Sequence, residues 1–462
     1  MTKSMMMLMP DGVSLRTFVL GGALSRVSDR AGAGVLHPAP EPLVPVYQRQ
    51  APGTTWTKLP PAQDNALVFL LRNAVNTAHG TWAGTFASRY RKPQRQPWRR
   101  AGALALARTV GRLSASPSGI TRLSRLHEAA ASRLPDVEWY RDLFRRTRPR
   151  LVFCAKQLSL RAVPPVLAAR SLGIPTATFI FSWDNLTAKG HIPAPFDHYL
   201  VWSEHMRLEL LHYYPAVPPS SVHVVGSPQF DPYARDDLLW SREEFFRRIH
   251  ADATRPLICY SGGDAGTCPE DPAHVRILLD LVRSGAIRGR PQVALRPMPV
   301  DDSRRYGLLI REYPELLVLK PAWVHRGSTW EDVMPLPQDV RLLANLVHHS
   351  ALNINVASTM TLDFSLKDRP VVNIAFDVAS PPPHGRPLWH HYYQYDHYRP
   401  VVELGAARIA RSPEELAAHV NAYLDDPALD REGRRRLTVM QLRGPLGQAS
   451  ERIADVLARI GA

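Results

Sequence analysis

Polar and ionisable residues gather directly after several short apolar runs, which is where ligands bind in open parallel sheets. The run Met5–Met9 is followed by the turn Pro10–Arg16, which leads into a predicted helix. Such a helix would direct backbone N–H groups, Asp11 and Arg16 into the crevice above the sheet. A simple turn without a ligand is the competing interpretation.

The densest group of such residues is Ser182–His191, again directly after an apolar run. Asp184 or His191 could accept a proton from a hydroxyl group, and Trp183 could stack against a sugar ring or fill the floor of the cleft. Capping of a helix by Asp184 and Asn185 is the structural alternative.

The loop Ser261–Thr267 follows a third run and contains Gly262 and Gly263, whose backbone amides could bind a phosphate. The loop lacks the Gly-Lys-Ser/Thr of a P-loop and does not match the dinucleotide-binding fingerprint. ATPase and dehydrogenase functions therefore lose their main support. Arg296, just beyond the next run, could neutralise a diphosphate through its planar guanidinium group.

The strongest local pattern is Asn353–Asp363, in which a predicted strand delivers a hydroxyl-rich turn to the start of a helix. Ser358 and Thr359 would bind donor phosphates there, because free amides and the positive end of the helix dipole converge at that point. Asp363 could reach a ribose or sugar hydroxyl, or only complement the helix dipole.

Metal and disulfide sites are not indicated. The stretch His390–His397 lacks a second cluster with which to complete a zinc site, so stacking or packing is the preferred interpretation. Cys154, Cys259 and Cys268 show no CxxC spacing, which gives neither a disulfide framework nor a zinc finger. We therefore expect the protein to reside in the reducing environment of the cytoplasm.

The elements that must position these residues form two series of short apolar runs with helical stretches between them. This alternation predicts two mostly parallel sheets covered by helices on both faces. The segment 30–100 is less regular, and we predict an exposed loop at Arg89–Arg100. The runs of the two series are Met5–Met9, Leu151–Cys154, Thr176–Phe181, Tyr199–Trp202 and Val222–Val225, then Pro256–Tyr260, Gln292–Leu295, Leu316–Leu319, Leu352–Val356 and Val371–Phe376.

Charge is distributed unevenly along the 462 residues, whose formal net charge is +15. Between Arg89 and Arg150 there are 16 Lys and Arg against four acids. This basic segment would attract an anionic membrane surface, a phosphorylated acceptor or nucleic acid, or would form a solvated face. Aromatic residues are not interleaved with the arginines, which argues against nucleic acid. No apolar run reaches the roughly 20 residues of a membrane span.

The stretch Asp339–Asp377 resembles the donor domain of glycosyltransferase-B enzymes. It is similar to the bacterial branch of CDP-glycerol glycerophosphotransferases and surface-polysaccharide glycosyltransferases. Within that branch it most resembles a set of glycosyltransferases that share the motifs Ser182–Thr187 and Gly226–Asp231. The resemblance extends roughly from Tyr140 to the end of the chain and includes Pro10–Arg16.

This resemblance implies an α/β fold of two facing Rossmann-like domains, with the acceptor on the first, the donor on the second and a last helix crossing back. We place the N-terminal domain at residues 1–232, the donor domain at 250–430 and the returning helix at 431–462. No metal or other cofactor is expected, since the nucleotide sugar is a substrate. Arg296 and the Ser358/Thr359 turn would stabilise the leaving group, and Asp11 or Asp184, with His191 third, would be the base.

One departure from the branch concerns the transferred group. The glycerophosphotransferases have Arg-x-His where this chain has Arg296-Pro297-Met298, which favours a sugar transferase with a different base. We expect transfer from a nucleotide-sugar donor to a cell-surface glycan or lipid-linked acceptor, in the cytoplasm or at the inner face of the membrane. A sugar-nucleotide epimerase, a glycerophosphotransferase and a non-enzymatic scaffold that binds membrane or nucleic acid are the alternatives.

Overall fold

The computed structural model describes residues 4–60, 64–90, 98–301, 303–325, 327 and 330–462. The chain forms two compact units. The N-terminal unit comprises Met1–Asp231 together with Gln441–Ala462, and the C-terminal unit comprises Pro232–Met440.

The N-terminal unit contains a seven-stranded sheet in the order β3-β2-β1-β4-β5-β6-β7, and every neighbouring pair is parallel. All four residues of β1 are buried, as expected of a parallel strand covered on both faces. The strands are β1 (Met5–Leu8), β2 (Ala33–His37), β3 (Thr55–Lys58), β4 (Val152–Cys154), β5 (Thr176–Phe179), β6 (His198–Val201) and β7 (Val222–Val224).

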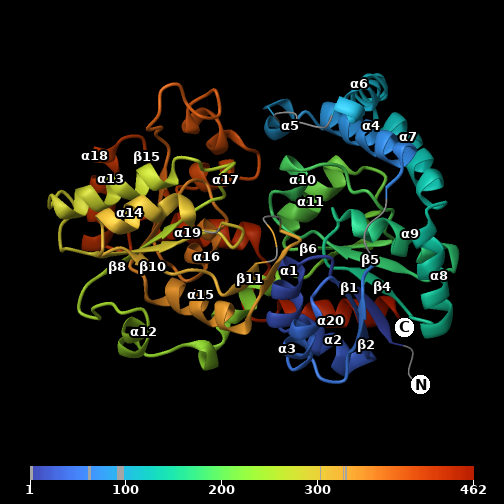
Figure 1. Ribbon diagram of the computed structural model, residues 1–462, viewed down its shortest axis with the longest axis horizontal. Coiled ribbons are helices and arrows are strands. Elements are labelled where there is room, and N and C mark those ends of the chain that lie inside the picture. Colours follow the sequence, from blue (N-terminus) through green and yellow to red (C-terminus); the bar gives the residue numbers. More distant parts are fainter. Residues whose placement is uncertain (1–3, 61–63, 91–97, 302, 326, 328–329) are drawn as a thin grey trace. The chain divides into compact units, whose positions relative to one another are not determined.

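Helices cover this sheet, and the C-terminal helix α20 (Ala449–Ile460) packs against α2 (Ala23–Ala31) (Figure 1). Between β3 and β4 the chain inserts a layer of helices, α4 to α7, which we call the helical insert. The helices are α1 (Gly12–Ser14), a π-helical turn (Leu15–Leu20), α2 (Ala23–Ala31), α3 (Val44–Gln48), α4 (Ala66–Ala83), α5 (Phe86–Tyr90), α6 (Trp98–Leu113), α7 (Pro117–Ala131), α8 (Pro135–Thr147), α9 (Val163–Ser171), α10 (Asn185–Ala188), α11 (Glu204–Tyr213) and α20 (Ala449–Ile460).

The C-terminal unit contains a six-stranded parallel sheet in the order β10-β9-β8-β13-β14-β15 and a separate antiparallel pair, β11 with β12. Apolar side chains of its central strands and flanking helices form one buried core. The strands are β8 (Leu257–Ser261), β9 (Gln292–Arg296), β10 (Leu317–Val318), β11 (Trp323–His325), β12 (Val333–Pro335), β13 (Leu352–Asn355), β14 (Val371–Ile374) and β15 (Arg408–Ala410). The helices are α12 (Arg242–Arg248), α13 (Asp271–Arg283), α14 (Gly307–Glu312), α15 (Pro337–His349), α16 (Met360–Leu366), α17 (Arg399–Glu403), α18 (Pro413–Asp425) and α19 (Arg431–Gln441).

Both sheets reverse their strand order once, between β1 and β4 in the first and between β8 and β13 in the second. In open α/β sheets the crevice at such a topological switch point is where ligands bind. The loops that follow these four strands are therefore the candidate ligand-binding loops. Within the described ranges, no helix combines the length and the apolar character needed to cross a membrane.

The predicted fold class is confirmed: the chain consists of two parallel-sheet α/β domains, and its last helix returns to the first of them. The sequence pattern did not predict β2, β3 and β15 of the parallel sheets or the antiparallel pair β11 and β12; β3 and β15 are short edge strands with little apolar character. The predicted loop at Arg89–Arg100 is wrong at both ends, where α5 and α6 lie, and its middle, 91–97, falls outside the described residues. These helices lack a clear periodic pattern of large apolar residues, because α6 packs closely on α4 through the small residues Ala74, Ala107 and Gly111.

Candidate active site

Asp11 and Lys156 meet at the switch point of the N-terminal sheet. Asp11 follows β1 and caps α1, and its Oδ1 accepts hydrogen bonds from the amide of Ser14 at 2.8 Å and from the Ser14 hydroxyl at 2.7 Å. Its Oδ2 forms an ion pair with Nζ of Lys156, which follows β4. The carboxylate is buried, so this pair joins the two strands across the crevice.

A chain of hydrogen bonds continues along the same edge of the sheet. Gln157 donates from Nε2 to Oδ1 of Asn185 at 2.9 Å and accepts the amide of Phe181 at 3.0 Å. Asn185 in turn donates to Oδ1 of Asp184 at 3.0 Å, and Lys189 lies 3.2 Å from the other Asp184 oxygen. The carboxylate of Asp184 is therefore already fixed by two neighbours.

Lys156 connects these two groups, because its ammonium lies 5.5 Å from the centre of the Phe181 ring. Of the predicted residues, Trp183 is buried in the same loop, and Arg16 is half-buried on the π-helical turn. The sequence reading missed Lys156 and Gln157. The rule that singled out Asp11 and Asp184 would have found both, since they follow the predicted strand Leu151–Cys154.

His191 has different neighbours from the two aspartates. Its ring lies 5.1 Å from that of His79 and 5.3 Å from that of Tyr214, and its backbone amide donates to Oδ1 of Asn76 at 2.8 Å. Burial lowers the pKa of His191 to about 3. A pKa this low makes the side chain a weak base at neutral pH, and the structure makes it part of a cavity wall.

In the C-terminal unit, the two glycines after β8 have a different role from the predicted one. The amide of Gly262 donates to the carbonyl of Arg296 at 3.0 Å, and that of Gly263 donates to Oδ2 of Asp271 at 2.7 Å. A side chain at Gly262 would lie 2.7 Å from the Tyr306 hydroxyl. Both amides are thus used internally, and close packing accounts for the glycines.

Asp271 and Arg305, which pattern reading did not single out, hold this loop in place. Arg305 donates to the carbonyl of Gly263 at 2.6 Å and lies 3.1 Å from Oδ2 of Asp271. Tyr260 donates its hydroxyl to Oδ1 of the same carboxylate at 2.7 Å. Burial raises the pKa of Asp271 to about 6. Internal hydrogen bonds therefore fix the loop Ser261–Thr267.

Arg296 lies at the carboxyl end of β9 with a buried partner. Its Nη2 donates to Oδ1 of Asp339 at 2.8 Å, and the two side chains are 7% and 1% exposed. Asp339 also accepts the amide of Ala322 and Nε1 of Trp323, both at 2.8 Å. Among the described residues, Nη1 of Arg296 has no hydrogen-bond partner. One nitrogen of the arginine predicted to bind diphosphate is thus buried without a hydrogen-bond partner.

The turn after β13 is held in an uncommon backbone conformation. Ala357 has a φ of 43°, a left-handed value rare for a residue with a side chain. Oδ1 of Asn355 accepts the amide of Ser358 at 2.8 Å, and the Ser358 hydroxyl accepts the amide of Met360 at 3.3 Å. Thr359 is the N-cap residue of α16, which has seven residues.

A buried polar network joins this turn to the neighbouring strands. Asn353 donates to the hydroxyl of Ser261 at 2.8 Å, which links β13 to β8 across the switch point. Asn355 donates to Asn353 at 2.7 Å and accepts from Asn373 of β14 at 3.0 Å. Buried polar groups satisfied in this way specify one conformation. The Ser358 turn is thus set by residues of three strands.

Asp363 is buried one turn into α16 and accepts a hydrogen bond from the hydroxyl of Tyr233. Oδ1 of Asp363 is thus bonded to a tyrosine of the same unit, and the predicted ribose or sugar contact stays a prediction. The stretch His390–His397 packs on the sheet, with Tyr393 donating to the carbonyl of Ile374 at 2.5 Å. Across the residues that the structure describes, no three or more His, Cys, Asp or Glu are grouped to hold a metal ion.

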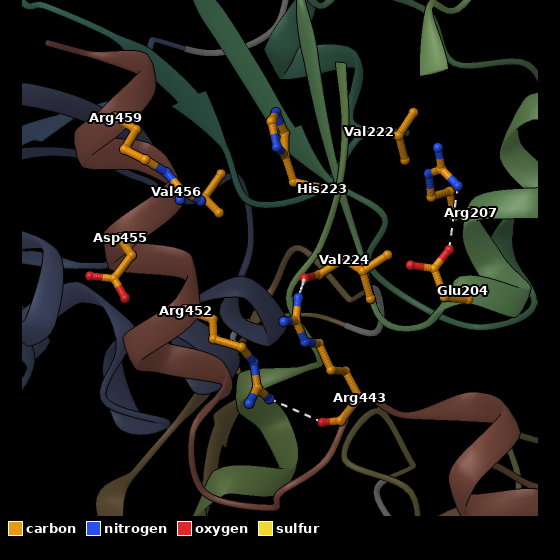
Figure 2. Close-up of a pocket in the computed structure, with 10 residues that line it drawn as sticks. All are labelled: Glu204, Arg207, Val222, His223, Val224, Arg443, Arg452, Asp455, Val456 and Arg459. Carbon is orange, nitrogen blue, oxygen red and sulfur yellow. Dashed lines mark hydrogen bonds and ion pairs between the residues drawn. The ribbon is translucent and has the colours of Figure 1, made fainter. Parts of the chain in front are cut away.

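A hollow of about 430 Å³ lies beside β7, the edge strand of the N-terminal sheet, and contains none of the predicted site residues. Figure 2 shows its arginines and the C-terminal segment that supplies most of them. Arg443 donates to the carbonyl of Val224, and Arg452 donates to that of Val225 at 2.7 Å. These arginines attach the end of the chain to the edge of the sheet.

Comparison of the sequence with protein-family models and with curated proteins gives no match. Solved structures of the same fold do exist. The S. aureus MnaA–UDP co-structure has a TM-score of 0.54 at 10% identity, covering 98% of this chain and 96% of that one. UDP-GlcNAc 2-epimerase from Neisseria meningitidis bound to UDP-GlcNAc has a TM-score of 0.51 at 10% identity, covering 99% of both chains. A glycosyltransferase from Rickettsia africae ESF-5 has a TM-score of 0.53 at 9% identity, covering 99% and 98%. At these identities the likeness concerns the fold.

Proposed function

We propose that this protein is a nucleotide-sugar-dependent glycosyltransferase that transfers a sugar to a cell-surface glycan or lipid-linked acceptor. One observation carries the proposal: polar side chains from different strands meet at both topological switch points. Asp11 pairs with Lys156 in the N-terminal unit, and Asn353 with Ser261 beside the Ser358 turn in the C-terminal unit. Open α/β sheets bind ligands at such points.

In the proposed donor site, Nη1 of Arg296 and the Ser358 turn bind the diphosphate. The left-handed Ala357 supports this assignment, because such a conformation costs about 1–3 kcal/mol and occurs preferentially at functional sites. These groups would stabilise the charge on the departing nucleotide without a metal ion.

On the acceptor side, Asp11 takes the proton of the acceptor hydroxyl as that oxygen attacks C1 of the sugar. The bond between C1 and the diphosphate oxygen breaks, and the nucleoside diphosphate leaves with the electron pair. Lys156 and Ser14 orient the carboxylate for this step. Asp184, held by Asn185 and Lys189, is the second candidate for the base.

The experiment begins with thermal-shift titrations against UDP, GDP, CDP, dTDP and CMP, since a ligand bound only by the native state raises the Tm. The matching nucleotide sugar is then incubated with the protein, with and without glycan or lipid-linked acceptors, and followed by NMR. Release of nucleotide that depends on an acceptor is the expected result. If no nucleotide raises the Tm, the proposal is wrong.

A sugar-nucleotide epimerase is the second candidate, favoured by the shared fold of the Neisseria meningitidis protein. An epimerase would change the configuration of the sugar with no acceptor present, and the acceptor-free NMR sample detects that product. The glycerophosphotransferase alternative stays a prediction, disfavoured by Met298 in place of the histidine of that branch.

A further inference from the structure

A cavity of about 830 Å³ lies under the helical insert of the N-terminal unit. Its walls come from α4, α7, the loop 191–196 and the segment 213–218, and they include neither Asp11 nor Asp184. Sites for small molecules typically measure about 300–1,000 Å³. This cavity is therefore large enough for a ligand, and the proposed transfer site leaves it without a function.

Most of the wall is apolar or aromatic. Val75 of α4 and Ile120 of α7 line it opposite Ile192, Phe196 and Tyr214. Except for Tyr214, these side chains are less than a tenth exposed, so they have little contact with water. An apolar chain would gain free energy by entering such a space, since it leaves water without displacing strong polar contacts.

Two polar groups of α7 on this wall lack partners. Nε2 of His127 and the hydroxyl of Ser124 are buried and, among the described residues, form no hydrogen bond. His127 is only 4% exposed, and burial lowers its pKa to about 4, so its ring is neutral at pH 7. Leaving a buried polar atom without a partner is unfavourable, and a ligand with a hydrogen-bonding group that reached these atoms would remove that cost.

The rim of the cavity is cationic. Arg72 and Arg170 have carboxylate partners, at 2.6 Å and 2.5 Å respectively. Arg122 and Arg125 are exposed on α7 and form no ion pair with any residue that the structure describes. Glu128 is the one carboxylic acid among the described lining residues; burial raises its pKa, and the charges of Arg170 and Arg125 nearby partly oppose that shift. Two guanidinium groups are thus available to an anionic head group, for which phosphate is the preferred partner.

The surrounding surface is apolar as well. Leu113 is 85% exposed at the end of α6, and Leu126, beside Arg122 and Arg125 on α7, is 56% exposed. Leucines between arginines are typical of surfaces that contact lipid. We propose that the cavity binds an amphiphile with a phosphate head group and an apolar chain, the head at Arg122 and Arg125 and the chain between α4 and α7. Its use as an acceptor rests on the proposed transferase function, whereas its binding does not.

Calorimetry with decyl phosphate, decanol and inorganic phosphate tests the proposal. Decyl phosphate should bind, decanol should bind at least about tenfold more weakly because it lacks the charged head, and phosphate alone should give no signal. Arg122→Gln with Arg125→Gln should reduce decyl phosphate binding to the level of decanol. Arg108→Gln with Arg112→Gln, on the exposed face of α6 and outside the cavity, is the matched control and should bind as wild type.

Filling the cavity gives an independent variant. Ser124→Trp should abolish binding of decyl phosphate and decanol alike, because the indole would occupy the space of the chain. Failure of the wild-type protein to bind decyl phosphate, or unchanged binding in both the double arginine variant and Ser124→Trp, would overturn the proposal. UDP binding measured on the same samples tests the donor site separately, so the two proposals can fail independently.

Discussion

Arg296 combines a structural contact with a proposed ligand contact, and Arg296→Lys separates them. A lysine ammonium can keep the single hydrogen bond to Oδ1 of Asp339, so the buried carboxylate retains a cation. Lysine has no second nitrogen in the position of Nη1. The variant should therefore fold normally and bind nucleotide poorly.

The expected losses in UDP affinity and in stability can be estimated from the hydrogen bond and the buried ion pair of Arg296. A hydrogen bond to a charged group contributes about 1.5–3 kcal/mol, and each 1.4 kcal/mol is tenfold in Kd, so UDP affinity should fall between about 10-fold and 150-fold in the lysine variant. Arg296→Met instead removes the cation beside the buried Asp339 carboxylate, which keeps only its hydrogen bonds from neutral groups such as Ala322 and Trp323. Because the partners are 7% and 1% exposed, the loss should approach the 3–5 kcal/mol typical of a broken buried pair, about 150-fold or more in the local opening constant.

Calorimetry with UDP measures the first effect, and hydrogen–deuterium exchange of the α15 peptide, which carries Asp339, measures the second. We expect α15 protection to be unchanged in Arg296→Lys and to drop by about 100-fold or more in Arg296→Met. Wild-type UDP affinity in a folded lysine variant would show that Arg296 only supports the fold. Unchanged α15 protection in the methionine variant would refute the energetic reasoning about the pair.

Three further outcomes are expected. Ser358→Ala with Thr359→Val should weaken UDP binding about 5-fold to 150-fold by calorimetry, at about 0.5–1.5 kcal/mol per lost hydrogen bond, with only a small decrease in Tm from the loss of the Met360 amide's partner; equal affinity in the folded variant would make the turn structural. Asp11→Asn should lower acceptor-dependent turnover at least about 100-fold with UDP affinity unchanged, and full turnover would exclude Asp11 as the base. Burial lowers the pKa of His79 to about 4. Between pH 6.5 and 4 the unfolded chain therefore binds a proton at this residue that the folded chain does not. The free energy of unfolding falls as pH falls through this range, by up to about 1.4 kcal/mol per pH unit. Melting curves at pH 7 and 5 should show a smaller loss in His79→Asn than in wild type, and equal losses would contradict the assignment.

The sequence was most informative where one local pattern decides the outcome. Apolar runs bounded by turns located most of the parallel strands, because a strand buried on both faces must be apolar throughout. Reading the residue after each run then located Asp11, Asp184 and the Ser358 turn. The same rule applies to Lys156, which also follows a predicted strand and lies in the crevice beside Asp11.

Contacts between residues that are distant in sequence could not be predicted from local patterns. Asp11 and Lys156 are 145 positions apart, and Arg296 and Asp339 are 43 apart. Nothing in a single sequence states that such residues meet; the strand order of the sheet brings them together. For the same reason, the amides of Gly262 and Gly263 looked available, whereas partners further along the chain occupy both of them.

The attachment of the C-terminal segment to β7 has a consequence for biosynthesis. Arg443 and Arg452 bind carbonyl groups at the edge of the N-terminal sheet, and α20 covers α2, yet all of these C-terminal residues follow the whole C-terminal unit in the chain. Until they emerge, the first domain exposes an unpaired strand edge and the apolar side of α2, a state prone to pairing with other chains. The N-terminal domain therefore begins to emerge first but can be completed only after the whole C-terminal domain has been synthesised.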